Sequence, residues 1–327
     1  MIASLISFTV SLFITRFLVG WLNRRGTLDR PNHRSSHTAP TPRGGGLAIV
    51  TACTLGFALA GGTSLDWLGW FFAPMSLALL GWLDDWKGGI SGGFRLLAQC
   101  LVAFVLIWFT SPLSHLPLPD PANLALTWVA WPLSALWLVA VVNLTNFMDG
   151  IDGLVASQGV IAGIAWSLYS GDGPGYLFAA GCAGFLLLNW HPARIFMGDV
   201  GSFFVGGMIA VLPFSVSGDS SASLLMTALF WWMPLSDASF TLLRRIVKGE
   251  KVWQAHRSHL YQRLVICGWS HAQVSLLYAL LGISIATITL VCKHTDRQMW
   301  LPLGTACALF TLLVSLVEHR ERRCSKG

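Results

Sequence analysis

The stretch 271–292 reads HAQVSLLYALLGISIATITLVC and contains no Asp, Glu, Lys or Arg. A helix rises about 1.5 Å per residue, so about 20 apolar residues are needed to cross the hydrocarbon core of a bilayer. The stretch is long enough for one crossing. It therefore predicts a membrane-spanning helix, and comparable stretches recur along the rest of the chain.

The composition of the whole chain agrees with this prediction. Of its 327 residues 54% are hydrophobic and only 11% are charged, whereas soluble domains carry about 25% charged residues. The 16 tryptophans fit a chain with many membrane interfaces, where indole rings lie among the headgroups. The seven cysteines are scattered without a C-x-x-C pair, so we expect neither a disulfide framework nor a zinc site. A soluble enzyme is excluded.

We expect an all-α integral membrane protein that forms one domain, residues 1–327, with about eleven spans. The predicted spans are 3–22, 45–61, 65–83, 95–111, 123–142, 153–169, 174–190, 201–217, 222–243, 271–292 and 299–317. The segments on one side of these spans hold 18 of the 21 Lys and Arg residues. By the positive-inside rule this side is cytoplasmic. The N-terminus is then periplasmic and the C-terminus cytoplasmic, in the inner membrane of a bacterium.

Two adjacent acids, Asp84 and Asp85, follow the span 65–83. Carboxylates at a helix end suit a hard cation such as Mg²⁺. Neighbouring residues of a helix do not face the same way, so the two acids would have different tasks. The alternative is an ordinary solvated helix end.

The segment 143–153, NLTNFMDGIDG, contains two amides and two carboxylates but no Lys or Arg. If it is helical, spacings of three place Asn143, Asn146, Asp149 and Asp152 along one face. Carboxylates without a local counter-charge favour a bound metal or a substrate. The segment resembles part of a calcium-binding loop but lacks the terminal Glu of an EF-hand.

Two further cytoplasmic segments combine glycines with charged residues. Arg43 precedes the glycine run 44–46, and both Arg and the backbone amides of such a run bind phosphate oxygens. Attraction of this basic loop to anionic lipid is the alternative. Asp199 lies between glycines just before the span 201–217, where it is either a metal ligand or a simple helix cap.

The last cytoplasmic motif is a histidine pair, His256 and His259, which are three residues apart and share a helix face. We favour a cationic contact with a diphosphate. A zinc pair lacks an evident third ligand, and an amphipathic interfacial segment is a further alternative. Within the predicted spans, Asp237 is the one acid apart from Asp66, which is the second residue of its span. We expect it to pair with Arg244 or Arg245, in a structural or a catalytic role.

These motifs are more specific together than singly, because all except Asp237 lie at one membrane interface. Clustered carboxylates, Arg, His and glycine-rich loops suit phosphoryl transfer through Mg²⁺. The active site is therefore expected in the cytoplasmic loops.

On these motifs the chain resembles the polyprenyl-phosphate N-acetylhexosamine-1-phosphate transferases, glycosyltransferase family 4. The family includes the phospho-N-acetylmuramoyl-pentapeptide transferase and the enzymes that start O-antigen. The resemblance runs from about Asp29 to His259 and is strongest at 143–154 and 192–202. It implies transfer of a sugar 1-phosphate from a UDP-N-acetylhexosamine to undecaprenyl phosphate, with release of UMP. It also implies Mg²⁺, which Mn²⁺ can replace, no nucleic-acid partner, and a homodimer.

The resemblance further implies roles for individual residues. Asp199 and Asp85 would bind the metal. The catalytic carboxylates would be those of Asp84, Asp85, Asp149 and Asp152. The substrate-binding residues would be Thr41, Arg43, Asn146, Asn189, Phe196, which would stack on the uracil, His256 and His259.

Some features depart from the peptidoglycan branch of the family. That branch has Lys three residues after the second acid of its pair, where this chain has Gly88, and consecutive histidines where this chain has His256-x-x-His259. These features and the stretch Arg34–His37 favour the O-antigen or teichoic-type initiating enzymes. Direct attack by the acceptor phosphate and a covalent phospho-Asp intermediate both remain open, and we favour direct attack.

Two other classes of membrane protein are alternatives to the transferase. A transporter for a phosphorylated or polyol solute would place ionisable groups near the bilayer midplane on broken helices, whereas here they cluster at one interface. A CDP-alcohol phosphatidyltransferase also uses clustered Asp and Mg²⁺. Its Asp-Gly-x-x-Ala-Arg run is absent, and residues 149–153 do not supply it.

Overall fold

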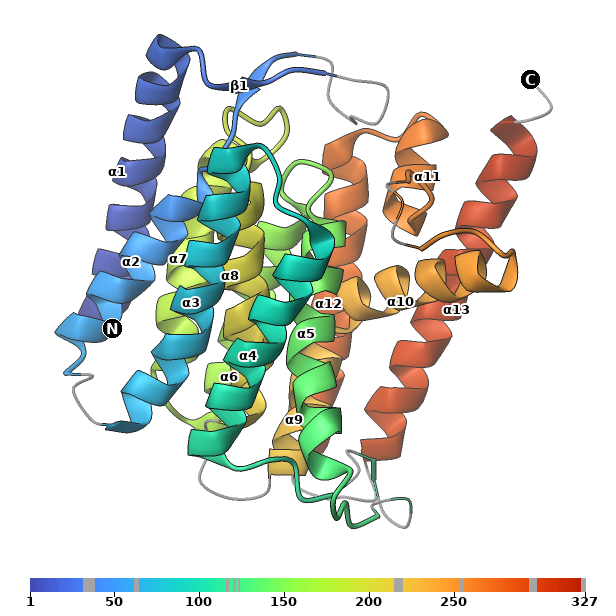
Figure 1. Cartoon of the computed structure of the whole chain (residues 1–327). Helices are drawn as coiled ribbons and strands as arrows, with labels where there is room; N and C mark the ends of the chain where they lie inside the picture. The colour runs from blue at the N-terminus through green and yellow to red at the C-terminus, as the bar shows by residue number, and fades with distance from the viewer. Residues whose placement is uncertain are drawn as a thin grey trace.

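The computed structural model describes residues 1–31, 39–61, 65–115, 118–119, 122, 124–214, 220–252, 254, 256–293 and 299–324, without the side chains of 65–70 and 220–222. The stretch Arg34–His37 lies outside these residues. Most of the chain is helical (Figure 1). Its helices are α1 (Ile2–Arg25), α2 (Gly46–Leu59), α3 (Leu65–Lys87), α4 (Gly92–Thr110), α5 (Ala130–Met148), α6 (Leu154–Ser170), α7 (Pro174–Asn189), α8 (Gly198–Val211), η1 (Leu212–Phe214), α9 (Ser220–Phe230), α10 (Trp232–Val247), α11 (Leu260–Ile266), α12 (His271–Cys292) and α13 (Trp300–Cys324).

The predicted all-α membrane class is confirmed. Within the described residues five helices are long and apolar enough to cross a membrane, namely α1, α4, α5, α12 and α13. Helices α2, α6, α7 and α8 are apolar but shorter. The number of eleven spans and the orientation in the membrane stay predictions.

The predicted span 222–243 is wrong as a single helix. The chain breaks at Trp231, where α9 ends and α10 begins in a different direction (Figure 1). Pro234 explains the break, because it has no N–H to donate to the carbonyl of Phe230 and its ring favours the first turn of a new helix. Trp231 itself is buried, and its indole N–H donates to Thr145 Oγ1 over 3.2 Å.

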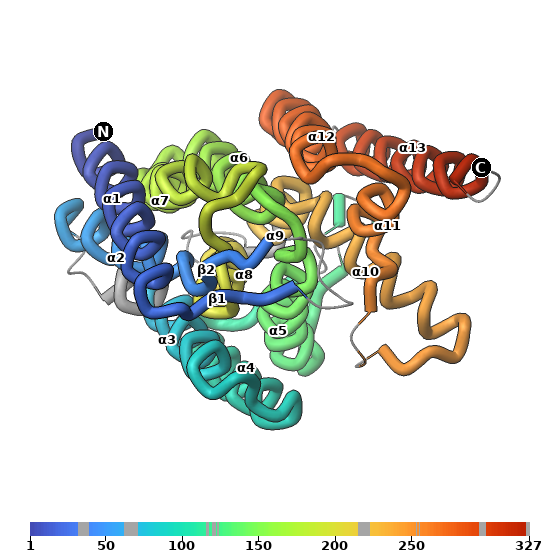
Figure 2. The backbone as a smooth tube through the Cα atoms, turned by 90° about the horizontal axis from the view of Figure 1, so that it is seen from above, coloured from blue at the N-terminus to red at the C-terminus, as the bar shows by residue number. Residues whose placement is uncertain are grey.

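Helix α8 forms the centre of the bundle. Seen from the end that carries the strands β1 (Leu28–Asp29) and β2 (Thr41–Pro42), α8 lies beneath them and α10–α13 gather to one side (Figure 2). Glycines allow close approach to its N-terminus. A Cβ on Gly46 would lie 2.1 Å from Cα of Gly201, and one on Gly81 would lie 2.2 Å from the carbonyl oxygen of Asp199. The starts of α2 and α8 and the end of α3 are thereby brought together.

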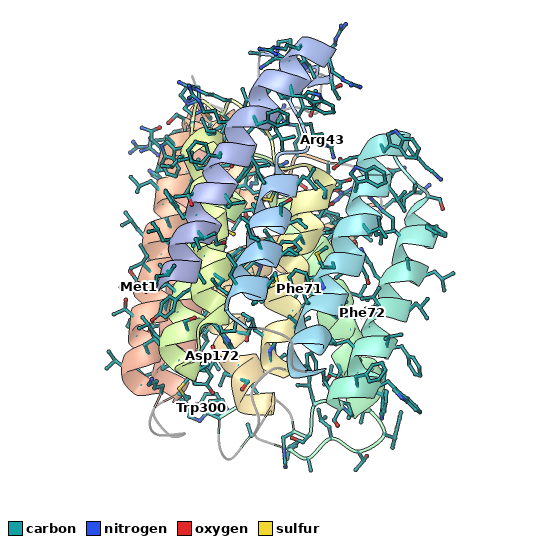
Figure 3. All side chains as sticks on the ribbon, turned by 90° about the vertical axis from the view of Figure 1, so that its left-hand side faces the viewer. Met1, Arg43, Phe71, Phe72, Asp172 and Trp300 are labelled. Atoms are coloured by element: carbon teal, nitrogen blue, oxygen red, sulfur yellow. The ribbon has the colours of Figure 1, made fainter. Side chains whose placement is uncertain are left out.

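The segments predicted to be cytoplasmic gather at one end of the bundle. The ribbon of β1 and β2, helix α11 and the C-terminus lie at the same end (Figure 1). Figure 3 shows Arg43 towards this end and Asp172 and Trp300 towards the other. The motifs that the sequence singled out are therefore neighbours in space.

Candidate functional site

The loop before α2 is joined to the loop before α8 by backbone hydrogen bonds. Phe196 N donates to Pro42 O over 2.8 Å, Gly45 N donates to Phe196 O over 2.9 Å, and Gly46 N donates to Met197 O over 2.8 Å. We call these three hydrogen bonds the backbone ladder. It holds the segment that contains Arg43 against the N-terminus of α8.

An acidic centre lies where this ladder meets α3 and α5. Nη2 of Arg43 is 2.9 Å from Oδ1 of Asp199 and 3.0 Å from Oδ1 of Asp85. Asn146 Nδ2 donates to the same oxygen of Asp199 over 3.0 Å. Asp85 Oδ2 accepts from Val200 N over 3.0 Å. Four predicted site residues from separate motifs thus share one centre.

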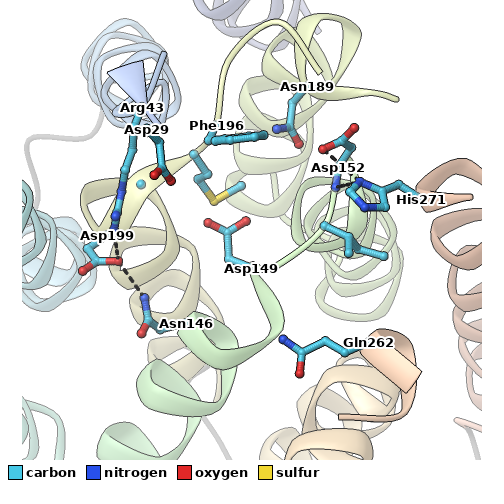
Figure 4. A pocket seen from close by; sticks show the side chains of 14 residues that line it. Asp29, Arg43, Asn146, Asp149, Asp152, Asn189, Phe196, Asp199, Gln262 and His271 are labelled. Carbon is cyan, nitrogen blue, oxygen red and sulfur yellow. Dashed lines mark hydrogen bonds and ion pairs between the residues drawn. The ribbon is translucent and has the colours of Figure 1, made fainter. Parts of the chain in front are cut away.

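Asp149 faces the cavity beside this centre (Figure 4). No residue that the structure describes donates a hydrogen bond to its carboxylate. Burial raises the pKa of Asp149 well above its usual value, Arg43 opposes the rise, and the carboxylates of Asp199 and Asp85 add to it. This carboxylate is therefore held where a cation or a proton would stabilise it.

Asp199 also has a raised pKa, of about 6. Burial is the largest cause, the charge of Arg43 opposes it, and the neighbouring carboxyls of Asp84 and Asp85 raise it further. A group of acids this close together stabilises a cation among them.

The predicted difference between Asp84 and Asp85 is found in the structure. Asp84 is only 4% exposed, and its Oδ2 is 2.9 Å from Arg95 Nη1, while Oδ1 accepts from the amide of Ile90. It therefore fixes the turn between α3 and α4 and does not line the cavity. Asp85 faces Arg43 and the acidic centre.

Asp152 lies at the cavity wall, but its carboxylate is held by hydrogen-bond donors. Its Oδ2 lies 2.7 Å from His191 Nδ1 and accepts from Ala193 N over 3.1 Å, and its Oδ1 lies 3.2 Å from His271 Nδ1. Burial alone would raise the pKa of Asp152, but the hydrogen bonds with His271 and His191 lower it. Asp152, His191 and His271 each offer one ligand atom, and these atoms lie within 4.8 Å of one another, which is close enough to hold a metal ion. The Asp152 carboxylate, however, already has partners for both of its oxygens. We interpret Asp152 as an anchor for its loop.

Asn189 joins two loops of the site. Its Oδ1 accepts from Gly153 N over 3.0 Å, and its Nδ2 donates to Ile195 O over 2.9 Å. The side chain lies at the cavity wall but is only 4% exposed. Asn189 therefore holds the position of Phe196, which also lines the cavity.

The cavity has a volume of about 260 Å³. The predicted residues Arg43, Asn146, Asp149, Asp152, Asn189, Phe196 and Asp199 line it, and so do Asp29, Gln262 and His271, which the sequence had not singled out (Figure 4). No spacing signal links these three residues to the other motifs.

Five predicted site residues do not line this cavity, namely Asp84 and Asp85, which are described above, and Thr41, His256 and His259. Thr41 is buried, and its Oγ1 donates to Ala39 O over 3.1 Å. The rings of His256 and His259 lie 4.8 Å apart beside α11, and His259 is only 2% exposed. Contact of these residues with a donor stays a prediction.

The acidic centre fits Mg²⁺. Oδ1 of Asp85 is buried and, within the described part of the chain, makes no hydrogen bond despite its proximity to Arg43. The carboxylate of Asp149 is similarly uncommitted, and Asp199 stands next to both. Carboxylate oxygens in such an arrangement are the ligands that Mg²⁺ prefers.

Comparison with known proteins identifies the family of the chain. The family model described as glycosyl transferase family 4 matches residues 67–217. A probable undecaprenyl-phosphate N-acetylglucosaminyl 1-phosphate transferase of Bacillus subtilis (strain 168) is 31% identical, over 97% of this chain and 91% of the relative. The chain belongs to this family of polyprenyl-phosphate N-acetylhexosamine-1-phosphate transferases. The family match covers Asp84, Asp85, Asn146, Asp149 and Asp199.

Other relatives have the same kind of name. A decaprenyl-phosphate N-acetylglucosaminephosphotransferase of Mycobacterium leprae (strain TN) is 31% identical, over 81% of this chain and 77% of the relative. A phospho-N-acetylmuramoyl-pentapeptide-transferase of Gloeothece citriformis (strain PCC 7424) is 30% identical, over 84% of this chain and 81% of the relative. Membership of this transferase family favours sugar-phosphate transfer over the transporter alternative.

Proposed function

We propose that this protein transfers an N-acetylhexosamine 1-phosphate from a UDP-sugar to undecaprenyl phosphate in a bacterial inner membrane, with release of UMP. One observation carries the proposal. Arg43 touches both Asp85 and Asp199 at the edge of a cavity into which Asp149 points. This is an arrangement for a diphosphate and a divalent cation.

The acidic centre would bind the diphosphate of the UDP-sugar donor. Asp199 and Asp85 would hold Mg²⁺, which neutralises charge on a diphosphate as the leaving group departs. Asn146 orients Asp199 through its hydrogen bond. Arg43 is suited to contact phosphate oxygens because its guanidinium presents paired donors. Phe196, at the cavity wall, offers a ring on which the uracil would stack.

The acceptor needs little activation. A phosphate monoester has a second pKa near 6, so at neutral pH it is largely dianionic. In direct attack, an oxygen of the acceptor forms a bond to the β-phosphorus of the donor, the bond from that phosphorus to UMP breaks, and UMP leaves with the electron pair. Asp84 is committed to Arg95, so Asp149 is the better candidate to place the acceptor. Mn²⁺ would substitute for Mg²⁺.

The branch of the family is a finer proposal. Gly88 and the spacing of His256 and His259 support an O-antigen or teichoic-type initiating enzyme rather than the peptidoglycan enzyme. Two of the relatives named above carry N-acetylglucosamine in their names, so UDP-N-acetylglucosamine is the first donor to test. A homodimer stays a prediction from the family resemblance.

The test measures UMP release by purified protein in detergent with UDP-N-acetylglucosamine, undecaprenyl phosphate and Mg²⁺. We expect release that needs both lipid and metal and that Asp199→Asn abolishes. Asp172→Asn is the matched control, because Asp172 makes a hydrogen bond with Ser170 in the loop between α6 and α7. Absence of UMP with N-acetylglucosamine, N-acetylgalactosamine and deoxy-sugar donors, from folded protein, would refute the proposal.

A further inference from the structure

Asp237 on α10 is completely buried but does not make the ion pair expected from the sequence. Arg245 lies 2.9 Å from Glu250 and donates to Gln254 O over 3.0 Å. Among the described residues no ion pair joins Asp237 to Arg245 or to Arg244, so the expected pairing is wrong. The reason is that the helix direction places Asp237 towards α11 and α12, while Arg245 turns to the loop that follows α10.

The partners of Asp237 are donors from three elements. Oδ1 accepts from Leu260 N over 2.8 Å and from Thr241 Oγ1 over 3.2 Å. Oδ2 accepts from Tyr261 N over 3.1 Å and from Tyr278 Oη over 2.7 Å. One carboxylate thus fixes the first two amides of α11 and ties them to α10 and α12.

Helix α11 depends on this contact more than a long helix would. It has only 7 residues, and the first amides of any helix have no partner within the helix. A short helix is also marginal without tertiary contacts. A negative charge at its N-terminus adds a favourable interaction with the helix dipole. The placement of α11 therefore follows from Asp237.

Helix α11 touches the candidate site at two places. Gln262 lines the cavity. Tyr261 Oη donates to Phe147 O over 3.0 Å, two residues before Asp149. A Cβ on Gly150 would lie 2.1 Å from the same hydroxyl, so the turn after Asp149 rests directly on the tyrosine.

The histidine before α11 is also set by Asp237. Nδ1 of His259 lies 3.8 Å from Oδ1 of Asp237 and, among the described residues, has no hydrogen-bond partner. His256 is next to it, with ring centroids 4.8 Å apart. The predicted phosphate-binding histidines are thus carried by the segment that Asp237 anchors.

We propose that Asp237 is a positioning residue for the transfer reaction, which holds α11 so that His259, Gln262 and the turn after Asp149 keep one geometry. The inference rests on the proposed function. Asp237 does not line the cavity and would touch no substrate. Its effect passes through Leu260 and Tyr261.

The chemistry requires a carboxylate at this position. Four donors converge on two oxygens, and an ionised carboxylate accepts on both. An Asn would offer one accepting oxygen and would turn its own N–H groups towards donors. Asp237→Asn therefore loosens the start of α11, whereas Asp237→Glu keeps an acceptor on both oxygens.

The test compares Asp237→Asn, Asp237→Glu and the control Asp172→Asn in the UMP-release assay, with hydrogen exchange of the backbone amides. For Asp237→Asn we expect about a tenfold rise in KM for the UDP-sugar, equivalent to about 1.4 kcal/mol. We also expect a rise in KM for undecaprenyl phosphate, because the turn after Asp149 rests on Tyr261, and faster exchange at 260–261. Asp237→Glu should restore part of the KM and of the protection. Loss of folded enzyme alone would change neither KM.

Two outcomes separate this inference from the proposed function. Wild-type protein that releases no UMP refutes the proposed function, and the exchange data then still report on α11. Active wild type together with an unchanged donor KM and unchanged exchange in Asp237→Asn overturns the role of Asp237. If Asp237→Asn does not accumulate as folded protein, Tyr278→Phe decides. It removes one donor, so we expect a smaller rise in donor KM with faster exchange at 260–261, and no change in either overturns the inference.

Discussion

Arg43 and Mg²⁺ should compete for the same carboxylates, and Arg43→Met tests this directly. The substitution keeps an unbranched stem close in size to the aliphatic part of Arg and removes the charged guanidinium. Breaking a buried ion pair costs about 3–5 kcal/mol, and breaking an exposed one costs about 0–1 kcal/mol. The Arg43 side chain is 43% exposed, against 14% for Asp85 and 17% for Asp199. We therefore expect the metal-free variant to lose about 1–2 kcal/mol of stability.

The effect on metal binding has the opposite sign. The single charge of Arg43 and the double charge of Mg²⁺, about 5 Å apart, repel by about 7 kcal/mol at an effective dielectric constant of about 20. Solvent at Arg43 screens most of this repulsion. Removing the arginine should then tighten Mg²⁺ binding about tenfold, which corresponds to about 1.4 kcal/mol. UMP release should nevertheless fall, because the donor diphosphate loses a cationic contact.

The measurement is thermal unfolding of detergent-purified protein in EDTA, followed by titration with Mg²⁺. Arg24→Met is the matched control, since Arg24 is exposed in the last turn of α1. It should change neither the metal-free stability nor the Mg²⁺ response. Mg²⁺ binding by Arg43→Met that equals or falls below the wild-type affinity would show that Arg43 does not compete with the cation.

Three further predictions concern the frame of the site. Asn189→Leu leaves the amide of Gly153 and the carbonyl of Ile195 without their partner, so unfolding in denaturant should show a loss of about 2–4 kcal/mol; a loss below about 0.5 kcal/mol would contradict this. Gly81→Ala places a methyl group against the backbone of α8, so the melting temperature and UMP release should both fall, and wild-type values for both would disprove the close contact. Arg263 donates to Glu321 and holds the pKa of that carboxyl below its ordinary 4.5. The resulting stabilisation is present above pH 4.5 and is lost as the pH falls through the folded-state pKa. The difference in melting temperature between wild type and Glu321→Gln should therefore disappear in acid. A difference that stays constant with pH would refute this prediction.

The chemical character of the site could be predicted from the sequence because the site uses residue types that are rare in a membrane protein. Asp85, Asn146 and Asp199 stand out against apolar surroundings, and adjacent helix positions point apart, which correctly separated Asp84 from Asp85. Arg43 stood out by its glycine run. Local patterns of this kind report which residues are unusual.

What the sequence could not provide were the partners from distant segments. The segment 143–153 offers Asp152 no counter-charge, but His191, in the loop after α7, and His271, at the start of α12, lie beside its carboxylate. The catalytic role of Asp152 stays a prediction. The expected partner of Asp237 was wrong because its donors also include residues of distant segments. Hydropathy also reports that a segment is apolar but not its direction, so one span was predicted where Pro234 begins a second helix.

The backbone ladder between the loops before α2 and α8 has a consequence for how such an enzyme diversifies. Its hydrogen bonds use main-chain atoms only, so they depend on residue identity only where a side chain has no room, at Gly45 and Gly46. A residue that lines the cavity from these loops without a place in the backbone ladder, such as Asp29, can vary while the scaffold beneath it stays fixed. A loop transplanted from a relative with another sugar preference should dock in the same register. In this part of the chain, substitutions that change the preferred substrate need not reduce the stability of the fold.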